Sequence, residues 1–169
     1  GMMDTYGYNG NTGGEIMSIF KNDYLEITEQ DNKTYIKTFK LGFQLKDFDS
    51  ILCALPRIKL TNFGTLKNIL STVSDNPQEF GIWLPSVVID ISKDKMQASI
   101  SLHESVNYIR ENKDKIRSKI QELIAQNNIV HGIQSINLDH ASPGKAILIA
   151  QGTPPKKGDD AVLTYLQLP

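Results

Sequence analysis

Two alternating runs of residues, Val87–Ile91 and Met96–Leu102, form the strongest pattern in this sequence. In each run every second residue is apolar, and the polar dipeptide Lys93-Asp94 lies between the runs. Because successive side chains of a β-strand point to opposite faces, a period of two gathers the apolar residues on one face. The pattern therefore predicts an antiparallel hairpin with one buried face.

A second hairpin is predicted nearer the N-terminus. Alternating runs span Tyr24–Glu29 and Thr34–Phe39, and the polar turn Gln30–Lys33 separates them. Runs of this length around a short polar turn are typical of two paired strands. Each half of the chain is thus expected to contain its own antiparallel sheet.

Two amphipathic helices are predicted after the first hairpin. Apolar residues recur on one helical face from Leu45 to Leu55, and Pro56 forbids continuation of that helix. Asn62 is a suitable N-cap for a second helix with apolar residues through Val73, and the short alternating run Arg57–Leu60 lies between the two. Two helices packed on a small sheet explain this arrangement.

A third helix is predicted in the second half of the chain. It starts between Ser105 and Asn112, ends at Asn127-Asn128, and carries five apolar residues on one face: Ile109, Ile116, Ile120, Leu123 and Ile124. Three strands are expected after it. They are a brief strand at Ile136–Leu138, a strand buried on both faces at Ala146–Ala150, and a last one at Val162–Leu168.

The predicted fold class is α+β, with two small subdomains that each contain a mainly antiparallel sheet and one or two packed helices. A chain of 169 residues can bury such cores without disulfides or metal. The polar loop Asp75–Glu79, followed by Gly81 and Pro85, places the boundary between the subdomains. We expect a disordered tail at residues 1–18, an N-terminal subdomain at 19–80 and a second subdomain at 81–169.

Charge and hydropathy restrict the partners and the compartment. The net charge of −1 predicts no general attraction to nucleic acid or to anionic lipid. No apolar run approaches the roughly 18–20 residues of a membrane span, so we expect a cytoplasmic protein. The single cysteine, Cys53, lies between Leu52 and Ala54, which favours a buried, inert thiol in a reducing compartment.

The sequence contains no motif of a catalytic nucleophile, a metalloprotease or a nucleotide site. Its three histidines, at 103, 131 and 140, lack the close spacing of zinc ligands. Four acidic residues lie near predicted strands or turns, and paired carboxylates could hold magnesium. The favoured alternative is that Asp90 faces solvent and the others form turns. These four residues are Asp90, Asp139, Asp159 and Asp160.

Three basic residues of the predicted third helix, Arg110, Lys113 and Arg117, can share a face that contacts phosphate. Acidic residues at 111, 114 and 122 are interspersed with them, which favours a solvated surface instead. We therefore predict no catalytic residue, no metal ligand and no cofactor. Whether the protein is an enzyme stays open, and the residues favour a non-enzyme.

The segment Gly152–Asp160 is predicted to form a rigid, tight loop. Pro154 and Pro155 fix φ and lack N–H donors, so a preceding strand cannot continue through them, and Gly158 suits a chain reversal. Two lysines at the tip could bind an anion together with the Gly158 backbone. A purely structural turn is the alternative. The candidate anion-binding or interaction loop comprises Gly152, Pro154, Pro155, Lys156, Lys157, Gly158 and Asp160.

Three separated segments resemble the N-terminal region of the flagellar assembly protein A family, formerly a domain of unknown function. Ile149–Asp160 is similar to its A-x-G-x-x-P-x-x-G-x-D-G segment, Ile91–Ala98 to its strand-turn-strand pattern, and Ile129–Ile133 to its I-x-[YF]-G-I step. The resemblance covers about residues 85–168. It departs from the family at three positions: Asn128 and Ala161 stand where glycine is usual, and His131 replaces an aromatic residue.

The resemblance implies a non-enzymatic N-terminal module in flagellar assembly. Family members typically continue into a right-handed β-solenoid, so the module is expected to position or cap that downstream domain and to bind a protein partner. The chain would then be a truncated form or a short relative. The alternative function is a palm-like nucleotide or nucleic-acid binding domain with metal-dependent phosphoryl-transfer ancestry.

A third hypothesis concerns Trp83 and its neighbours Ile82 and Leu84. They could form an exposed apolar surface that binds a regulatory protein. A single tryptophan is more often part of a core, and this is the favoured interpretation.

Overall fold

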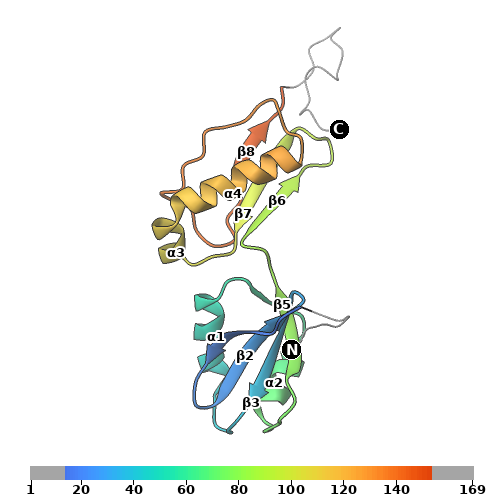
Figure 1. Cartoon of the computed structure of the whole chain (residues 1–169), viewed down its shortest axis with the longest axis vertical. Coiled ribbons are helices and arrows are strands. Elements are labelled where there is room, and N and C mark those ends of the chain that lie inside the picture. The colour runs from blue at the N-terminus through green and yellow to red at the C-terminus, as the bar shows by residue number, and fades with distance from the viewer. Residues whose placement is uncertain (1–13, 154–169) are drawn as a thin grey trace. The chain divides into compact units, whose positions relative to one another are not determined.

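The computed structural model describes residues 14–153 and divides into two compact units, which meet in the sequence between Leu84 and Pro85 (Figure 1). Each unit is an antiparallel sheet with two helices, so the predicted α+β class is confirmed. The first unit contains β1 (Met17–Lys21), β2 (Leu25–Gln30), β3 (Lys33–Thr38), α1 (Leu45–Ala54), β4 (Ile58–Leu60), α2 (Phe63–Leu70) and β5 (Gln78–Trp83). The second contains β6 (Val87–Ile91), β7 (Gln97–Leu102), α3 (Val106–Glu111), α4 (Lys113–Gln126) and β8 (Ile147–Gln151).

The five-stranded sheet of the first unit has the order β1-β2-β3-β5-β4, and every neighbouring pair is antiparallel. The predicted hairpin is confirmed as β2–β3. Its two turn residues, Asp31 and Asn32, have φ angles of 52° and 66°. Asp and Asn tolerate this left-handed region, which matches the right-handed twist of paired strands.

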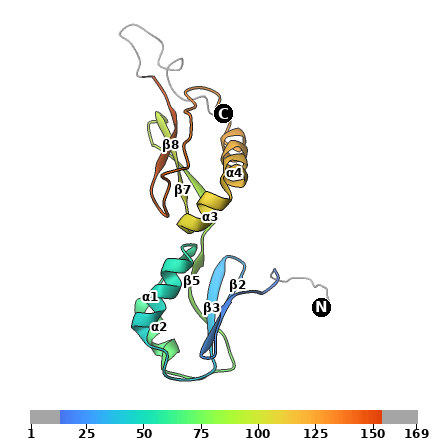
Figure 2. The ribbon, with the colours of Figure 1, turned by 90° about the vertical axis from the view of Figure 1, so that its left-hand side faces the viewer.

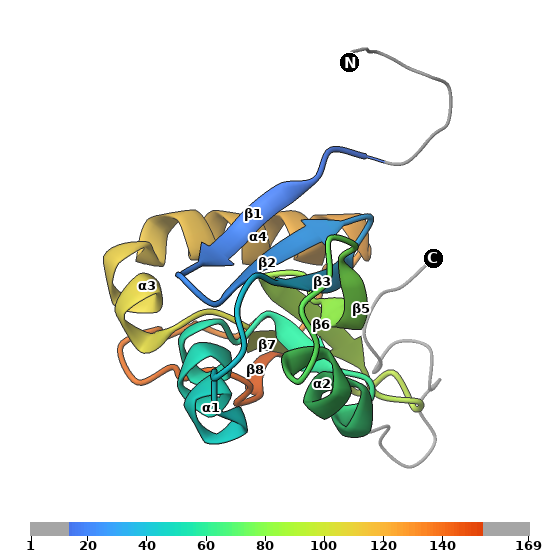
Figure 3. The ribbon, with the colours of Figure 1, turned by 90° about the horizontal axis from the view of Figure 1, so that it is seen from below.

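Helices α1 and α2 lie together on one side of β2 and β3 (Figures 2 and 3). Both were predicted. Helix α2 starts at the expected cap, because the Asn62 Oδ1 atom accepts a hydrogen bond from the Thr65 backbone N at 3.0 Å. Three rings fill the core beneath the helices. Phe48 meets Phe43 and Phe80 edge to face, with ring centroids 6.5 and 5.8 Å away.

Two strands of the first unit fall where no strand was predicted. Strand β1 begins at Met17, within the expected tail 1–18. Strand β5 runs across the expected boundary between residues 80 and 81. It pairs with β3 on one side and β4 on the other, and at Gly81 a Cβ atom would lie 2.5 Å from the Lys59 carbonyl oxygen. Close pairing on both sides therefore fixes β5.

The expectation of a buried thiol was wrong, because Cys53 is exposed. The core face of α1 is set by Phe48 and Ile51, which are both buried. A residue two positions after Ile51 is rotated by roughly 200° around the helix, so its side chain points to solvent. An apolar run in the sequence thus does not show which of its members reach the core.

The second unit has a three-stranded sheet in the order β6-β7-β8. The predicted hairpin is confirmed as β6–β7, with Val87 opposite Leu102 and Ile91 opposite Ala98. Helix α4 lies alongside β7 and β8 (Figure 2). The core between sheet and helices contains only aliphatic residues among its buried members, including Ile100, Leu102, Ile109, Ile116, Ile120 and Ile149.

The predicted helix is confirmed as α4, which begins after Asn112 and ends at Gln126, but Ile109 lies on a separate helix, α3, on the other side of a break at Asn112. Asn112 has φ −125° and ψ 32°, and its side chain donates a hydrogen bond to the Tyr108 carbonyl oxygen at 2.9 Å. The Asn112 backbone N also donates to the Tyr108 carbonyl oxygen at 2.9 Å, so the side-chain bond adds a second donor at the C-terminal end of α3. The break changes the direction of the chain between the two helices.

The three strands predicted after the helices of the second unit have different outcomes. The strand predicted near Ala146–Ala150 is confirmed as β8. No strand forms at Ile136–Leu138, where the chain instead crosses toward the helices. The predicted strand Val162–Leu168 lies outside the described residues.

Candidate functional site

The predicted anion-binding loop lies almost entirely outside the described residues. Only its first member, Gly152, is described, and its backbone N donates a hydrogen bond to the Met96 carbonyl oxygen at 2.7 Å. The roles suggested for Lys156 and Lys157 stay predictions.

A different loop, Val130–Ile133, is held firmly against β8. Gly132 has φ +73°, and a Cβ atom there would lie 2.1 Å from the Gln151 carbonyl oxygen. The backbone N of Gln151 donates to the Gly132 carbonyl oxygen at 2.9 Å, and Ile133 forms a β-bridge with Ala150. Only glycine combines this φ with so close an approach, so the loop requires it.

The Val130–Ile133 loop presents apolar side chains to solvent. Val130 is 60% exposed and Ile133 is 51% exposed, and His131 between them is also exposed. The loop begins after Asn128, whose φ of 56° lies in the left-handed region that asparagine adopts readily. A loop whose backbone is fixed and whose large apolar side chains are exposed is suited to contact another polypeptide.

The three basic residues considered as a phosphate-contacting face are already engaged. Arg110 Nη1 donates to the Leu138 carbonyl oxygen at 2.9 Å, and Lys113 Nζ lies 2.9 Å from Asp139 Oδ1. Arg117 pairs with Asp114 at 3.7 Å. Arg110 and Lys113 therefore fasten the segment 138–139 to the junction of α3 and α4.

Two of the four acidic residues fall in the described part of the chain. Asp90 is exposed on β6, as predicted. The pKa of the Asp139 carboxyl is lowered because Lys113 donates a hydrogen bond and brings a positive charge, with smaller effects from His140 and Arg110. Within residues 14–153 no group of three or more His, Cys, Asp or Glu side chains is placed to hold a metal ion. Asp159 and Asp160 lie outside the described residues.

Trp83 is half-buried at the end of β5. Its ring packs against the core of the first unit, and the Arg57 guanidinium carbon lies 4.4 Å from the ring centroid. Arg57 also donates from Nε to the Leu84 carbonyl oxygen at 2.7 Å. The arginine therefore shields one part of the ring from solvent.

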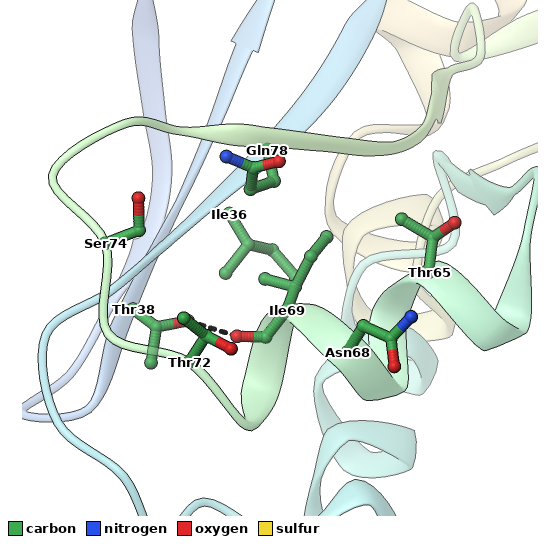
Figure 4. A pocket seen from close by; sticks show the side chains of 8 residues that line it. All are labelled: Ile36, Thr38, Thr65, Asn68, Ile69, Thr72, Ser74 and Gln78. Carbon is green, nitrogen blue, oxygen red and sulfur yellow. Dashed lines mark hydrogen bonds between the residues drawn. The ribbon is translucent and has the colours of Figure 1, made fainter.

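The first unit also contains a cavity of about 410 Å³ that the sequence did not indicate (Figure 4). It lies between α2, β3 and the segment 74–78 that leads into β5. Ile36 and Ile69 are buried residues on its floor, and six uncharged polar residues complete the lining: Thr38, Thr65, Asn68, Thr72, Ser74 and Gln78. These residues come from distant parts of the sequence, and no local pattern brings them together.

Residues 87–168 match the family model described as Flagellar Assembly Protein A N-terminal region. The second unit belongs to this family. The match covers the hairpin β6–β7, the helices, the Val130–Ile133 loop and β8, which agrees with the resemblance seen in the sequence. Comparisons with curated proteins and with solved structures gave no match.

The structure explains two residues of the flagellar assembly protein A region in this chain. Gly132, the glycine of the I-x-[YF]-G-I step, is the residue that contacts the end of β8. Asn128, where the family usually has glycine, keeps a positive φ. None of the helices within residues 14–153 is long and apolar enough to cross a membrane.

Proposed function

We propose that the second unit is a non-enzymatic, cytoplasmic docking module of a flagellar-assembly-type protein. It positions or caps the β-solenoid expected to follow it, and it also binds protein partners. The Val130–Ile133 loop carries this proposal, because its exposed apolar side chains stand on a backbone that is fixed to β8.

The fixed backbone favours binding. A loop that is ordered before contact loses little conformational entropy when a partner covers it. Gly132 and its contacts with Gln151 and Ala150 supply that order. Burial of the Val130 and Ile133 side chains then adds apolar contact area at a small entropic cost.

The position of the loop supports the choice of a domain that follows β8 as its occupant. Gln151 is the last residue of β8, and it hydrogen bonds to Gly132, between Val130 and Ile133. Any polypeptide that continues from β8 therefore starts beside the loop. Covalent attachment gives such a polypeptide an effective concentration of roughly millimolar or more, so a modest apolar patch is sufficient to hold it.

A binding titration tests the docking surface. A β-solenoid domain of the flagellar assembly protein A family is added to this chain as a separate protein, and calorimetry measures the affinity. We expect the double variant Val130→Asp, Ile133→Asp to bind at least about tenfold more weakly, since each aspartate brings a charge into an apolar contact. Val106→Asp, at a residue of α3 that is 43% exposed, is the matched control and should bind normally.

The result that contradicts docking is unchanged affinity of the double variant. The flagellar role is tested separately in a flagellated source strain from which the gene has been deleted. Loss or misplacement of flagella supports the role, whereas normal flagellar number and swimming contradict it.

A further inference from the structure

The cavity of the first unit has the chemistry of a ligand site. Its floor is apolar, its rim is hydrogen-bonding, and its volume of about 410 Å³ lies within the roughly 300–1,000 Å³ typical of small-molecule sites. We propose that this cavity binds an uncharged sugar of one or two rings. The inference concerns the first unit and is independent of the docking function of the second.

One wall of the cavity is the polar side of α2 and the residues just after it. Thr65, Asn68 and Thr72 are spaced three and four residues apart, which places them on one side of a helix. Within residues 14–153, the side-chain polar atoms of these three residues make no hydrogen bond to protein. Their donors and acceptors are thus available to a ligand.

The opposite wall is an arch formed by residues 74–78. Ser74 Oγ accepts a hydrogen bond from the Asn76 backbone N at 3.1 Å, and Gln78 Nε2 donates to the Asn76 carbonyl oxygen at 3.3 Å. These bonds shape the arch, and both its ends are attached to β3, because the Ser74 backbone N donates to the Thr38 carbonyl oxygen at 3.2 Å and Gln78 pairs with Ile36. Figure 4 shows the Gln78 and Asn68 side chains on different sides of Ile36 and Ile69. The two amides can therefore reach the edge of a ring placed between them.

The floor is formed by residues that are almost fully buried. Ile36 is 0% exposed and Ile69 is 7% exposed. The Thr38 hydroxyl, which is also buried, is already used, because it donates to the Ile69 carbonyl oxygen at 3.2 Å. The floor thus presents carbon atoms to a ligand and no free hydrogen-bonding group. An apolar face of the ligand would cover it.

The charge of the lining restricts the ligand. None of the eight lining residues is ionisable. Lys67, the lysine of α2, lines a separate cavity with Gly42 and Phe43. A phosphate or carboxylate placed between Asn68 and Gln78 would lose hydration without gaining a counter-charge, so an uncharged ligand is favoured. A sugar ring is uncharged and fits both the apolar floor and the polar rim. Its C–H faces can pack on the floor, and its hydroxyls can donate and accept hydrogen bonds at the rim.

The test is a titration of the ¹⁵N-labelled chain with glucose and with maltose, followed by NMR. We expect the side-chain amide signals of Asn68 and Gln78 to shift with a saturable dependence on sugar concentration. Asn68→Leu and Thr72→Val should each weaken binding roughly tenfold, since each removes one hydrogen-bonding group. Asn107→Leu on α3, an exposed asparagine outside the cavity, is the control and should leave binding unchanged.

Glucose 6-phosphate and adenosine are the comparison ligands. Glucose 6-phosphate should bind at least about tenfold more weakly than glucose, because the cavity holds no cation. The proposal is overturned if neither sugar shifts the Asn68 and Gln78 signals, or if the phosphate form or adenosine binds more tightly than the neutral sugars. It is also overturned if the cavity variants retain full affinity while the backbone spectrum shows an intact fold.

Discussion

The two units have the same kind of architecture but differ in the residues that form their cores. Each has an antiparallel sheet with two helices, but the core of the first unit is built on the contacting rings of Phe43, Phe48 and Phe80. The fully buried members of the second core are aliphatic. Large rings concentrate buried surface in few residues, whereas branched aliphatic side chains distribute it over many. The first unit should therefore be more sensitive to loss of a single side chain.

In the second unit, close contacts fix a loop that is exposed to solvent. Gly132 lets the Val130–Ile133 loop approach β8, and Arg110 fastens the segment near Leu138 to α3. Contacts of this kind fix the position of the exposed Val130–Ile133 loop. The second unit is also the part of the chain that matches the flagellar assembly family. The following predictions test this comparison of the two units.

The largest effect is expected from Phe48→Ala in the first unit. Phe48 is 0% exposed and contacts two other rings, so the substitution should lower the free energy of unfolding by about 3–5 kcal/mol. Trp83 is the single tryptophan of the chain and lies in the first unit, so its fluorescence follows that unit during denaturation.

The matched variant is Ile120→Ala in α4, which is also 0% exposed and should destabilise the second unit by about 2–5 kcal/mol. The NMR methyl signals of the second unit should report this loss of stability, while the denaturation midpoint followed by Trp83 fluorescence stays unchanged. A shift of the Trp83 transition by Ile120→Ala would show that the two cores do not unfold separately.

The next effect is expected from Gly132→Ala. Alanine at φ +73° is strained by about 1–2 kcal/mol, and its Cβ would collide with the Gln151 carbonyl oxygen, so the total loss should exceed about 2 kcal/mol. Gly144→Ala is the matched control. It has φ +77° with no atom within 4 Å of the added Cβ, and it should lose only about 1 kcal/mol.

Amide hydrogen exchange at Gln151 reports the difference between the glycine variants, because this N–H is bonded to Gly132. Exchange should accelerate in Gly132→Ala and remain slow in Gly144→Ala. Equal acceleration in both would mean that the close approach to β8 contributes nothing beyond the backbone conformation.

A smaller effect is expected from Asn62→Ala. The Asn62 side chain caps α2, so its loss should destabilise the first unit by about 1 kcal/mol. The Trp83 transition measures this change, and Asn107→Ala on α3 is the control. If the Trp83 transition does not move, the capping bond is not significant for the stability of the first unit.

The smallest effect concerns the exposed pair Lys113–Asp139. Because the folded-state pKa of Asp139 is lowered, the pair stabilises the fold above the ordinary carboxyl pKa and is lost as pH falls through the folded value. An NMR titration of the Asp139 carboxyl carbon should show this low pKa, and Lys113→Met should raise it toward the ordinary value. An unchanged pKa in the variant would exclude Lys113 as the main cause.

Local patterns predicted most of the elements. The hairpins β2–β3 and β6–β7, the end of α1 before Pro56 and the cap at Asn62 all depend on residues close in sequence. Strand β5 was missed because Pro77 and Gly81 obscure its pattern, and pairing with β3 and β4 forms it. The break at Asn112 was missed because Ile109 and Ile116, seven residues apart, continue one helical spacing across it.

The candidate sites were less predictable than the fold. The I-x-[YF]-G-I resemblance pointed to Gly132, but its contact with Gln151 joins residues that are distant in sequence. The cavity of the first unit depends on β3, α2 and the 74–78 arch together. Distances between such segments are set by packing of the whole unit, and no short window of sequence contains them.

The central proposal is that a β-solenoid joined after residue 169 covers the Val130–Ile133 loop. The most direct test is alkylation of Val130→Cys in a Cys53→Ser background, which removes the exposed native thiol. The rate is compared between this chain and a fusion in which a β-solenoid domain of the family follows residue 169. The account predicts alkylation at least about tenfold slower in the longer protein. Equal rates in the two proteins would contradict it.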